Sequence, residues 1–336
     1  MNYKKALRHG FDVSSKTVSL KRGNKVEKVH AIPSLPDDSK YAYPLKLQCV
    51  TKQTPWGGSK LSERYNKPKI ENLGECWELS VREKEKSAIA NGICKGLTLE
   101  EYLEKHTDIP SKDFPLLIKL LDAREKLSVQ VHPQNEKTEM WHIVEADPGA
   151  SIIFGIKDGV SLEEIAEATK DGSIEKHLNR IRVSAGETYF IPAGTVHAIG
   201  EGIVIAEIQQ NSDTTYRFYD YGRPRELHTE KALESIRNYT PKEIDEIRFS
   251  VSAESNGGAL LAACEYFTVI KHDITDRQAF SLGEKPFVSL LCTEGNGKIV
   301  WCGGEEEINV GDCFFIPTAI ASFEIRGNLK VISTTI

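Results

Sequence analysis

The sequence predicts a mainly β protein of two barrels with helical insertions, and three observations lead to this prediction. The chain of 336 residues is long enough to bury a full hydrophobic core without disulfides or a structural metal. From about residue 182 onward, short apolar runs alternate with glycine-rich turns and only one helical stretch interrupts them. A strand-turn-strand segment also occurs twice, which indicates two copies of one β unit.

The composition excludes several classes of partner. Lysine and arginine number 43 against 49 acidic residues, and this net charge of −6 gives no general attraction for nucleic acid. We find no apolar run near the roughly 20 residues of a membrane helix, so no membrane partner is predicted. The seven cysteines lack C-x-x-C spacing and predict reduced thiols. With no pattern typical of a signal peptide, we expect a cytoplasmic protein.

The pattern along the chain divides it into three parts. Residues 1–40 hold nine lysines and arginines against four acids, and we expect a leader or extension without assigned chemistry. Residues 41–244 are predicted to be the chemistry-bearing domain, with helical insertions at about 97–125 and 161–180. Caps are predicted at Thr98 and at Ser161, which opens a Ser-Leu-Glu-Glu capping signature. Residues 245–336 are predicted to form the second barrel.

The repeat relates the two predicted barrels. The segment Val183–His197 recurs as Asn309–Ser322, and aligning Gly186 with Gly311 superposes a Phe-Ile-Pro run in both copies. The second copy has Ser322 where the first has a histidine. We therefore predict a metal-free second barrel. Its interior should be closed by apolar side chains, for which we expect Phe287, Leu290, Phe315 and Phe323.

One predicted strand carries an unusual polar face. In the run Leu127–Pro133, alternation places Ser128, Gln130 and His132 on one side and two valines on the other. Polar residues facing inward predict a wet or metal-bearing interior. A strand with a solvent-exposed polar face is the alternative, and the run alone does not decide between them.

A histidine motif follows in the first repeat copy. Its spacing is Gly-x5-Pro-x-Gly-x2-His, with Gly194 shaping the turn before His197. It resembles the second metal-binding motif of the cupins. The usual first cupin motif has two histidines and a nearby glutamate, whereas here Gln130 and His132 are followed, after six residues, by Glu139. This departure indicates a particular branch of the cupins.

That branch is the type I mannose-6-phosphate isomerases, which the chain resembles from about residue 43 to its end and in the form of the shorter bacterial members. Six stretches carry the resemblance: Trp56-Gly-Gly, Gly74-Glu-Cys-Trp-Glu-Leu-Ser80, Ser128-Val-Gln-Val-His-Pro133, Lys137-Thr-Glu139-Met-Trp, Pro192-Ala-Gly-Thr-Val-His-Ala-Ile-Gly200 and Glu207-Ile-Gln-Gln-Asn-Ser-Asp-Thr-Thr-Tyr-Arg217. The resemblance implies cupin jelly-roll barrels. It also implies interconversion of mannose 6-phosphate and fructose 6-phosphate through an enediol.

The resemblance further implies the residues of the site. It implies zinc as the metal, and four residues match the family's ligands: Gln130, His132, Glu139 and His197. Because the second repeat copy has Ser322 in place of the histidine, we predict one zinc per chain. Two neutral imidazoles and one carboxylate form a coherent zinc site, with the glutamine amide oxygen as an extra ligand.

The same resemblance implies catalytic and substrate-binding residues. Arg217, Lys137 and Asp213 are expected to be catalytic. The two cations can hold a phosphate or an oxyanion, and Asp213 is expected beside Arg217 as the acid of a pair near the substrate. The residues expected to contact the phosphosugar are Ser128, Glu207 and Trp56. Lys137, Asp213, Glu207 and a zinc-bound water all remain open as the group that moves the proton.

Two other functions compete with the isomerase. A metal cupin that acts on another small substrate, such as an oxygenase, is one, because nitrogen and carboxylate ligands also hold iron. A sugar-binding cupin without turnover is the other. The two expected cations and the full ligand set argue against both. The sequence does not predict an oligomeric state.

Overall fold

The computed structural model describes residues 17–22, 25–30, 40–255 and 257–336. The chain divides into two compact units, residues 1–40 and residues 41–336. In the first unit, the strands β1 (Thr17–Arg22) and β2 (Lys25–His30) form an antiparallel hairpin. The other elements all belong to the second unit.

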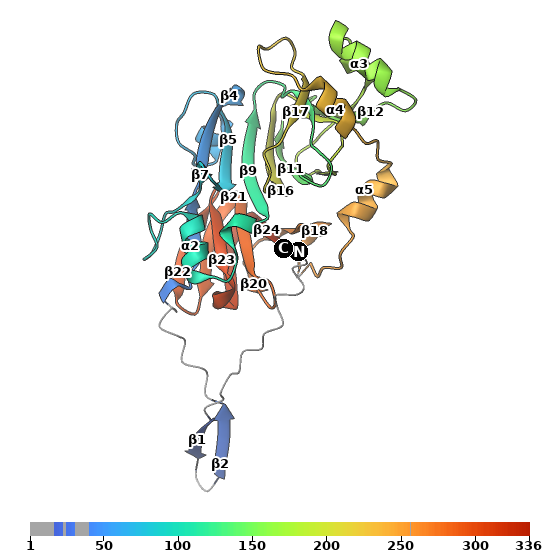
Figure 1. Ribbon diagram of the computed structural model, residues 1–336. Coiled ribbons are helices and arrows are strands. Elements are labelled where there is room, and N and C mark those ends of the chain that lie inside the picture. Colours follow the sequence, from blue (N-terminus) through green and yellow to red (C-terminus); the bar gives the residue numbers. More distant parts are fainter. Residues whose placement is uncertain (1–16, 23–24, 31–39, 256) are drawn as a thin grey trace. The chain divides into compact units, whose positions relative to one another are not determined.

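Two antiparallel sheets lie in the first part of the second unit (Figure 1). The five-stranded sheet has the order β13 (Leu178–Arg182), β12 (Ser151–Ile156), β15 (His197–Ile199), β10 (Val129–Val131) and β17 (Tyr216–Tyr219). The six-stranded sheet has the order β14 (Thr188–Ile191), β11 (Glu139–Ala146), β16 (Ile203–Gln210), β9 (Leu116–Ala123), β4 (Val50–Gly58) and β5 (Leu73–Leu79). A small ladder of β6 (Val81–Arg82) and β7 (Glu85–Lys86) follows β5.

A third sheet contains most of the C-terminal strands, drawn orange to red in Figure 1. Its path is β18 (Ala259–Ala263), β19 (Thr268–Ile274), β24 (Ser322–Thr335), β21 (Phe287–Trp301), β23 (Cys313–Pro317), β3 (Leu45–Gln48) and β8 (Ala88–Ile89). β20 (Arg277–Ser281) pairs with β24, and β22 (Gly304–Asn309) pairs with β21. Because β3 and β8 come from the N-terminal side of residue 245, this sheet crosses the predicted domain boundary. The fold is mainly β, as predicted, whereas two separate barrels stay a prediction.

Five helices connect or cover these sheets in the described part of the chain. They are α1 (Lys60–Arg64), α2 (Leu99–His106), α3 (Leu162–Asp171), α4 (Thr229–Ser235) and α5 (Pro241–Arg248), with short 3-10 turns at Ser111–Asp113, Ile174–His177 and Thr318–Ile320. The predicted caps before α2 and α3 are confirmed, because Thr98 and Ser161 each form a complete capping box. Among the described residues, no helix is both long and apolar enough to cross a membrane.

The predicted helical insertions need correction. Residues 116–124, expected to be helical, hold the strand β9, and every residue of β9 is buried. A strand buried on both faces reads as a continuous apolar run, and such a run matches a helical period equally well. In the second insertion, predicted over 161–180, the helix ends at Asp171 and β13 begins at Leu178.

The polar face of the predicted strand over 127–133 does point inward. Val129 and Val131 of β10 belong to a buried cluster with Ile165 of α3 and Ala232 of α4. These helices therefore cover the valine side of the strand. Gln130, on the other side, lines a cavity between the two sheets.

The four residues expected to close the second barrel are all buried, but they do not share one interior. Phe287 and Phe315 belong to the large core cluster that includes Leu45 and Leu79 from the N-terminal strands. Leu290 and Phe323 lie in a separate cluster within the third sheet. Alternate residues of a strand face opposite sides, so positions 287 and 290 of β21 cannot share a face.

Candidate metal centre and substrate cavity

A cavity of about 140 Å³ opens between the five-stranded and six-stranded sheets. Its lining includes ten polar or charged residues and several apolar ones. The charged and amide side chains are Glu75, Lys119, Gln130, Lys137, His197, Glu207, Arg217 and Arg225, together with Ser128 and Thr215. Trp56, predicted to contact substrate, also lines the cavity and is almost fully buried.

Strand register explains why the polar residues of the five-stranded sheet meet. Gln130 of β10 lies directly opposite His197 of β15 on one side and opposite Arg217 of β17 on the other. Residues paired across antiparallel strands project from the same face. Three side chains far apart in the sequence therefore form one row along the cavity.

The six-stranded sheet contributes a second row. Trp141 pairs with Glu207, Glu207 with Lys119, and Lys119 with Trp77, across the strands β11, β16, β9 and β5. The Lys119 ammonium lies 3.2 Å from Glu207 Oε1 and 3.4 Å from Glu75 Oε2. The Trp141 indole donates to Glu207 Oε2 at 3.1 Å. A buried polar network thus faces the row of the other sheet.

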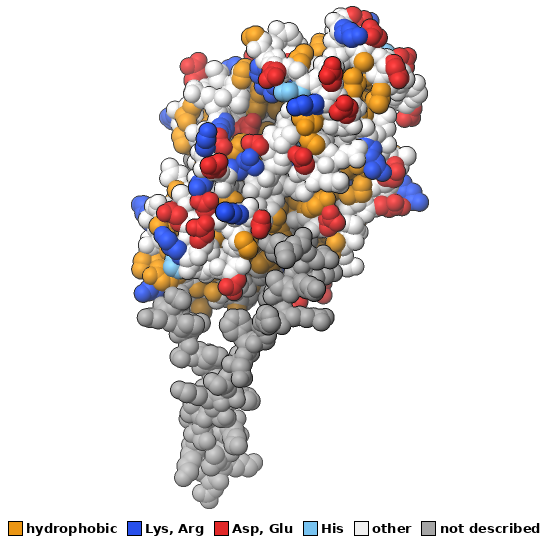
Figure 2. Space-filling model, in the orientation of Figure 1, with side chains coloured by type: hydrophobic (Ala, Val, Ile, Leu, Met, Phe, Trp, Pro, Cys, Tyr) orange, Lys and Arg blue, Asp and Glu red, His pale blue; other side chains and the backbone are white. Residues whose placement is uncertain are grey.

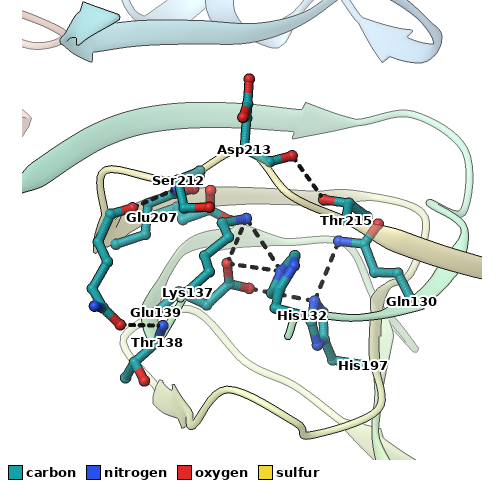
Figure 3. Close-up of polar contacts among 12 residues, drawn as sticks. Gln130, His132, Lys137, Thr138, Glu139, His197, Glu207, Ser212, Asp213 and Thr215 are labelled. Atoms are coloured by element: carbon teal, nitrogen blue, oxygen red, sulfur yellow. Dashed lines mark hydrogen bonds and ion pairs between the residues drawn. The ribbon is translucent and has the colours of Figure 1, made fainter. Parts of the chain in front are cut away.

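His132, Glu139 and His197 form the candidate metal centre (Figure 3). Their donor atoms lie within 4.8 Å of one another, and each side chain is 1% exposed. His132 Nε2 lies 3.3 Å from Glu139 Oε2, and His197 Nε2 lies 3.5 Å from Glu139 Oε1. The three predicted ligands therefore converge on one point.

Backbone carbonyls fix the orientation of both imidazoles. His132 Nδ1 lies 2.8 Å from the carbonyl oxygen of Thr214, and His197 Nδ1 lies 2.8 Å from that of Thr195. A carbonyl only accepts, so each Nδ1 carries the proton and each Nε2 keeps a free lone pair. This is the arrangement that histidine metal ligands adopt.

The turn before His197 requires a glycine. Gly194 has φ +93°, and a Cβ there would meet the Ser235 carbonyl oxygen at 3.0 Å. Its amide donates to the His132 carbonyl at 3.0 Å, which ties the turn to the neighbouring ligand strand. The predicted motif therefore positions two ligands at once.

The charges at this centre suit a cation. Lys137 Nζ lies 2.9 Å from Glu139 Oε2 and 3.2 Å from His132 Nε2, so its ammonium already lies among the donors. Neither oxygen of Glu139 accepts a hydrogen bond of acceptable geometry, although both are buried. A buried carboxylate needs a positive partner, which the Lys137 ammonium supplies here and which a metal ion among the same donors could also supply. His132, Glu139 and His197 thus fit a metal ion.

The protonation states agree with this. Burial, and then the Lys137 ammonium, lower the pKa of His132 to about 3. Burial also lowers the pKa of His197. For Glu139, burial favours the neutral acid, but Lys137 and the two imidazoles outweigh it and hold the pKa well below its usual range. Two neutral imidazoles and one carboxylate are the forms that bind zinc.

Gln130, the fourth predicted ligand, also borders this centre. Its Nε2 lies 3.2 Å from His197 Nε2, and its Oε1 lies 3.4 Å from the hydroxyl of Ser128. A half-turn of the amide exchanges the two ends and brings the oxygen to the imidazole side. The side chain is therefore within reach of the metal centre.

Two arginines approach one end of the cavity. Arg217 donates from Nε to the Ser128 hydroxyl at 3.1 Å, and Arg225 is held by a two-pronged ion pair to the buried Asp220 at 2.6 and 2.7 Å. Burial, and then the like charge of Arg225, lower the pKa of Arg217. An anion between the two guanidiniums would relieve this repulsion.

Asp213 is the predicted catalytic residue that the structure leaves apart. Its carboxylate pairs with Arg82 at 2.7 Å, and its side chain is 56% exposed. Figure 3 shows the carboxylate turned away from the histidines. Arg217 and Lys137, by contrast, both line the cavity.

Lys119 and Arg225 were not predicted from the sequence. Lys119 lies in the run that was expected to be helical. A helical prediction does not show that its side chain faces the cavity. A single lysine within the otherwise apolar run Leu116–Leu121 was the available signal. Burial opposes its charge, but Glu207 and Glu75 outweigh burial and raise the pKa of Lys119.

The fold and this centre define a mainly β protein with a buried His/Glu/His metal candidate beside a cavity that two arginines line. Family models match as "Phosphomannose isomerase type I, catalytic domain" over residues 45–150 and as "Mannose-6-phosphate isomerase, cupin domain" over residues 259–336. Mannose-6-phosphate isomerase ManA of Bacillus subtilis is 35% identical over 313 residues, which cover 86% of this chain and 98% of that protein. The chain therefore belongs to the type I mannose-6-phosphate isomerases.

Solved structures agree with this assignment. A crystal structure of mannose 6-phosphate isomerase from Bacillus subtilis is 34% identical, with a TM-score of 0.78 over 87% of this chain and 99% of that one. A mannose 6-phosphate isomerase bound with zinc and yttrium is 16% identical, with a TM-score of 0.69 over 88% and 99% of the two chains, and shows the shared fold. The predicted family and the predicted isomerase class are confirmed.

Proposed function

We propose that this isomerase interconverts mannose 6-phosphate and fructose 6-phosphate through an enediol and depends on one zinc per chain. The observation that carries the proposal is the cavity itself, because His197 of the buried His/Glu/His centre lines it together with Arg217 and Arg225. An aldose-ketose isomerase of a phosphosugar needs both, one for the carbonyl end and one for the phosphate. The relatives that are 34% and 35% identical are named as isomerases of this substrate.

The metal end uses residues that the structure brings together. His132, Glu139 and His197 would hold zinc, with Gln130 as a further ligand through its amide oxygen. When bound, zinc acts as a Lewis acid on the oxygens of C1 and C2. The carbonyls of Thr195 and Thr214 keep the two imidazoles in the ligand tautomer.

The phosphate end uses Arg217 and Arg225. Arg225 is held by the buried Asp220, so little side-chain entropy remains to be lost when an anion binds. Ser128, which accepts from Arg217 Nε, fixes the second guanidinium. Two positioned guanidiniums would orient a dianionic phosphate and thereby the sugar chain toward the metal end.

Two groups of the chain would serve the proton transfer between C1 and C2. Glu207 lies in the cavity row, and its burial raises the pKa of this carboxyl above the usual value. Such a carboxyl can hold and return a proton at Oε1, the oxygen that faces Lys119. Lys137 Nζ is the second group, since it borders both the cavity and the metal centre. Asp213 is placed less well for this role, because its carboxylate pairs with Arg82.

The finer features of the fold and location belong to the same proposal. We retain two jelly-roll barrels, divided near residue 245, with the metal in the first. We also retain a cytoplasmic location and a small phosphosugar as the substrate, with neither nucleic acid nor membrane as partner. The mixture of acidic and basic side chains on the face shown in Figure 2 supports the last point, because it offers no single-sign field.

A coupled assay tests the reaction. The full chain with mannose 6-phosphate should produce fructose 6-phosphate, and a chelator should abolish the activity until zinc is restored. Binding of the sugar phosphate without turnover would instead favour a sugar-binding cupin. Full activity in thoroughly metal-depleted protein would contradict the zinc dependence.

A further inference from the structure

A second group of potential metal ligands lies apart from the substrate cavity. Cys49, Cys76 and Glu78 place their ligand atoms within 4.8 Å of one another. We call these three residues the thiol cluster. Among the described residues that line the cavity, none belongs to it.

Strand register brings the thiol cluster together. Val50 of β4 pairs with Trp77 of β5, and Thr51 pairs with Cys76. Continuing this register by one residue places Cys49 opposite Glu78. Since alternate residues share a face, both thiols and the carboxylate project from the same side of the two strands.

A buried ion pair borders the thiol cluster. Lys67 Nζ lies 2.6 Å from Glu78 Oε1 and donates to Glu78 Oε2 at 2.7 Å. It also donates to the carbonyl of Gly311 at 2.5 Å. Glu78 is fully buried, and its Oε1 accepts no hydrogen bond of acceptable geometry. Both oxygens of the carboxylate therefore lie against the Lys67 ammonium, and a cation at Oε1 would share this oxygen with Lys67 or move the ammonium toward Oε2.

The spacing suits a thiophilic cation. With Zn–S bonds of about 2.3 Å and tetrahedral angles, two thiolate ligands lie about 3.8 Å apart. The donor atoms of the thiol cluster already lie within 4.8 Å of one another, so rotamer adjustments of about 1 Å are enough. Cys76 is fully buried, whereas Cys49 is half-buried, so a cation can reach the thiol cluster from the side of Cys49.

We propose that the thiol cluster is a binding site for a divalent cation softer than Zn²⁺, with Cd²⁺ as the probe, separate from the catalytic centre. The ligands would be the Cys49 and Cys76 sulfurs and one oxygen of Glu78, with the other oxygen kept by Lys67. The catalytic centre offers nitrogen and oxygen donors and this site offers sulfur, so soft cations should divide between the two accordingly.

Charge balance supports the site. Counted from two uncharged thiols and the ion pair of Glu78 with Lys67, the thiol cluster carries no net charge without metal. A divalent cation that displaces two thiol protons leaves two thiolates, one carboxylate, one ammonium and the ion, which again sum to zero. Binding therefore releases two protons and leaves no net charge buried.

The site would also affect stability. Lys67 connects Glu78 of β5 to the turn at Gly311, which precedes β23 of the third sheet. An ion bound only by the folded chain stabilises it by a free energy that grows with the logarithm of the ion concentration relative to the dissociation constant. Cadmium should therefore raise the unfolding temperature.

Titration of the full, zinc-loaded chain with Cd²⁺ tests the proposal. The first added equivalent should produce a sulfur-to-cadmium charge-transfer absorption in the ultraviolet and release two protons, which a pH indicator counts. The catalytic centre contains no sulfur, so its own exchange cannot produce this absorption. Failure of the isomerase assay would leave this readout unaffected, which separates this proposal from the proposed function.

Serine variants locate the site. Cys49→Ser, at a half-buried position where loss of folding is not expected, should weaken cadmium binding by at least about 100-fold, because loss of outer-shell partners alone costs about 10- to 100-fold. Cys76→Ser should do the same. Cys302→Ser, which removes an exposed cysteine, is the matched control and should keep the absorption. Absence of the absorption in the unchanged chain, or its full retention in Cys49→Ser, would overturn the proposal.

Discussion

The two copies of the strand-turn-strand segment show how one backbone frame can serve two purposes. Both copies turn at a glycine with positive φ, +93° at Gly186 and +84° at Gly311, and both continue into a strand, β14 or β23, whose Phe-Ile pair is buried. The first copy ends at His197, which is buried beside Glu139. The second ends at Ser322, which is exposed. The shared backbone frame thus determines the path of the chain, and the side chains at its end determine whether a metal can bind.

The neighbouring strands complete this difference. In the first copy, β14 pairs with β11, the strand that supplies Glu139. In the second, β23 pairs with β21, where Phe315 lies opposite Ser289 and Ile316 opposite Val288. A metal centre therefore needs polar residues on several strands at once, and substitution of one position cannot create or replace it.

The largest effect is expected at the histidines of the first copy and its facing strand. His132→Ala and His197→Ala should each abolish tight zinc binding and reduce turnover by at least about 100-fold, while the fold stays intact because the apolar clusters are untouched. Metal analysis and circular dichroism on each variant measure this. His142→Ala, which removes a buried histidine hydrogen-bonded to Thr188, is the control and should keep its zinc. Full zinc occupancy in either ligand variant would remove that histidine from the centre.

The next effect concerns Arg217, at the proposed phosphate end of the cavity. Arg217→Ala should reduce kcat/KM by about 10- to 100-fold, the value of a charge-assisted hydrogen bond, with unchanged zinc content. A loss confined to KM would indicate phosphate binding, and a loss in kcat would indicate a contact made in the transition state. Lys137→Ala should behave similarly. The exposed ion-pair variant Arg64→Ala serves as control, and kinetics like those of the unchanged enzyme in Arg217→Ala would refute the assignment.

Much of this comparison could be predicted from the sequence. Alternation predicted that Gln130 and His132 share a polar face, and the resemblance to the family indicated that this face holds the metal ligands. Lys119 and Arg225 could not be placed, because their role depends on which strands pair. Asp213 was predicted to be catalytic from its neighbourhood in the sequence, but Arg82, 131 positions earlier, holds it away. The thiol cluster was not predicted for the same reason, since its cysteines lie on adjacent strands and have no characteristic spacing in the sequence.

The glycines of the two copies should differ in their effect on stability. A Cβ at Gly311 would lie 1.9 Å from the Tyr65 carbonyl oxygen, whereas a Cβ at Gly186 meets nothing within 4 Å. Gly186→Ala should therefore cost only the strain of a positive φ, about 1 to 2 kcal/mol. Gly311→Ala adds a backbone clash and should cost about 2 to 5 kcal/mol. Denaturant unfolding of both variants measures the difference. Equal losses in the free energy of unfolding would show that the backbone at Tyr65 moves away from the new Cβ at little cost.

The smallest effect is expected where the second copy is given the missing ligand. Ser322→His restores a histidine at the position of His197, but the strands around it offer apolar partners. The one histidine described on the third sheet, His272, is already engaged with Ser333 at 2.9 Å and with Gln278 at 2.8 Å. A lone imidazole on an exposed strand end gives a metal one ligand, which is too few to hold it. Zinc content and kcat/KM of Ser322→His should therefore match those of the unchanged enzyme. Retention of an additional zinc ion that is lost on reversion to serine would show that the second copy keeps a latent metal site, and that the frame determines more of the chemistry than we infer.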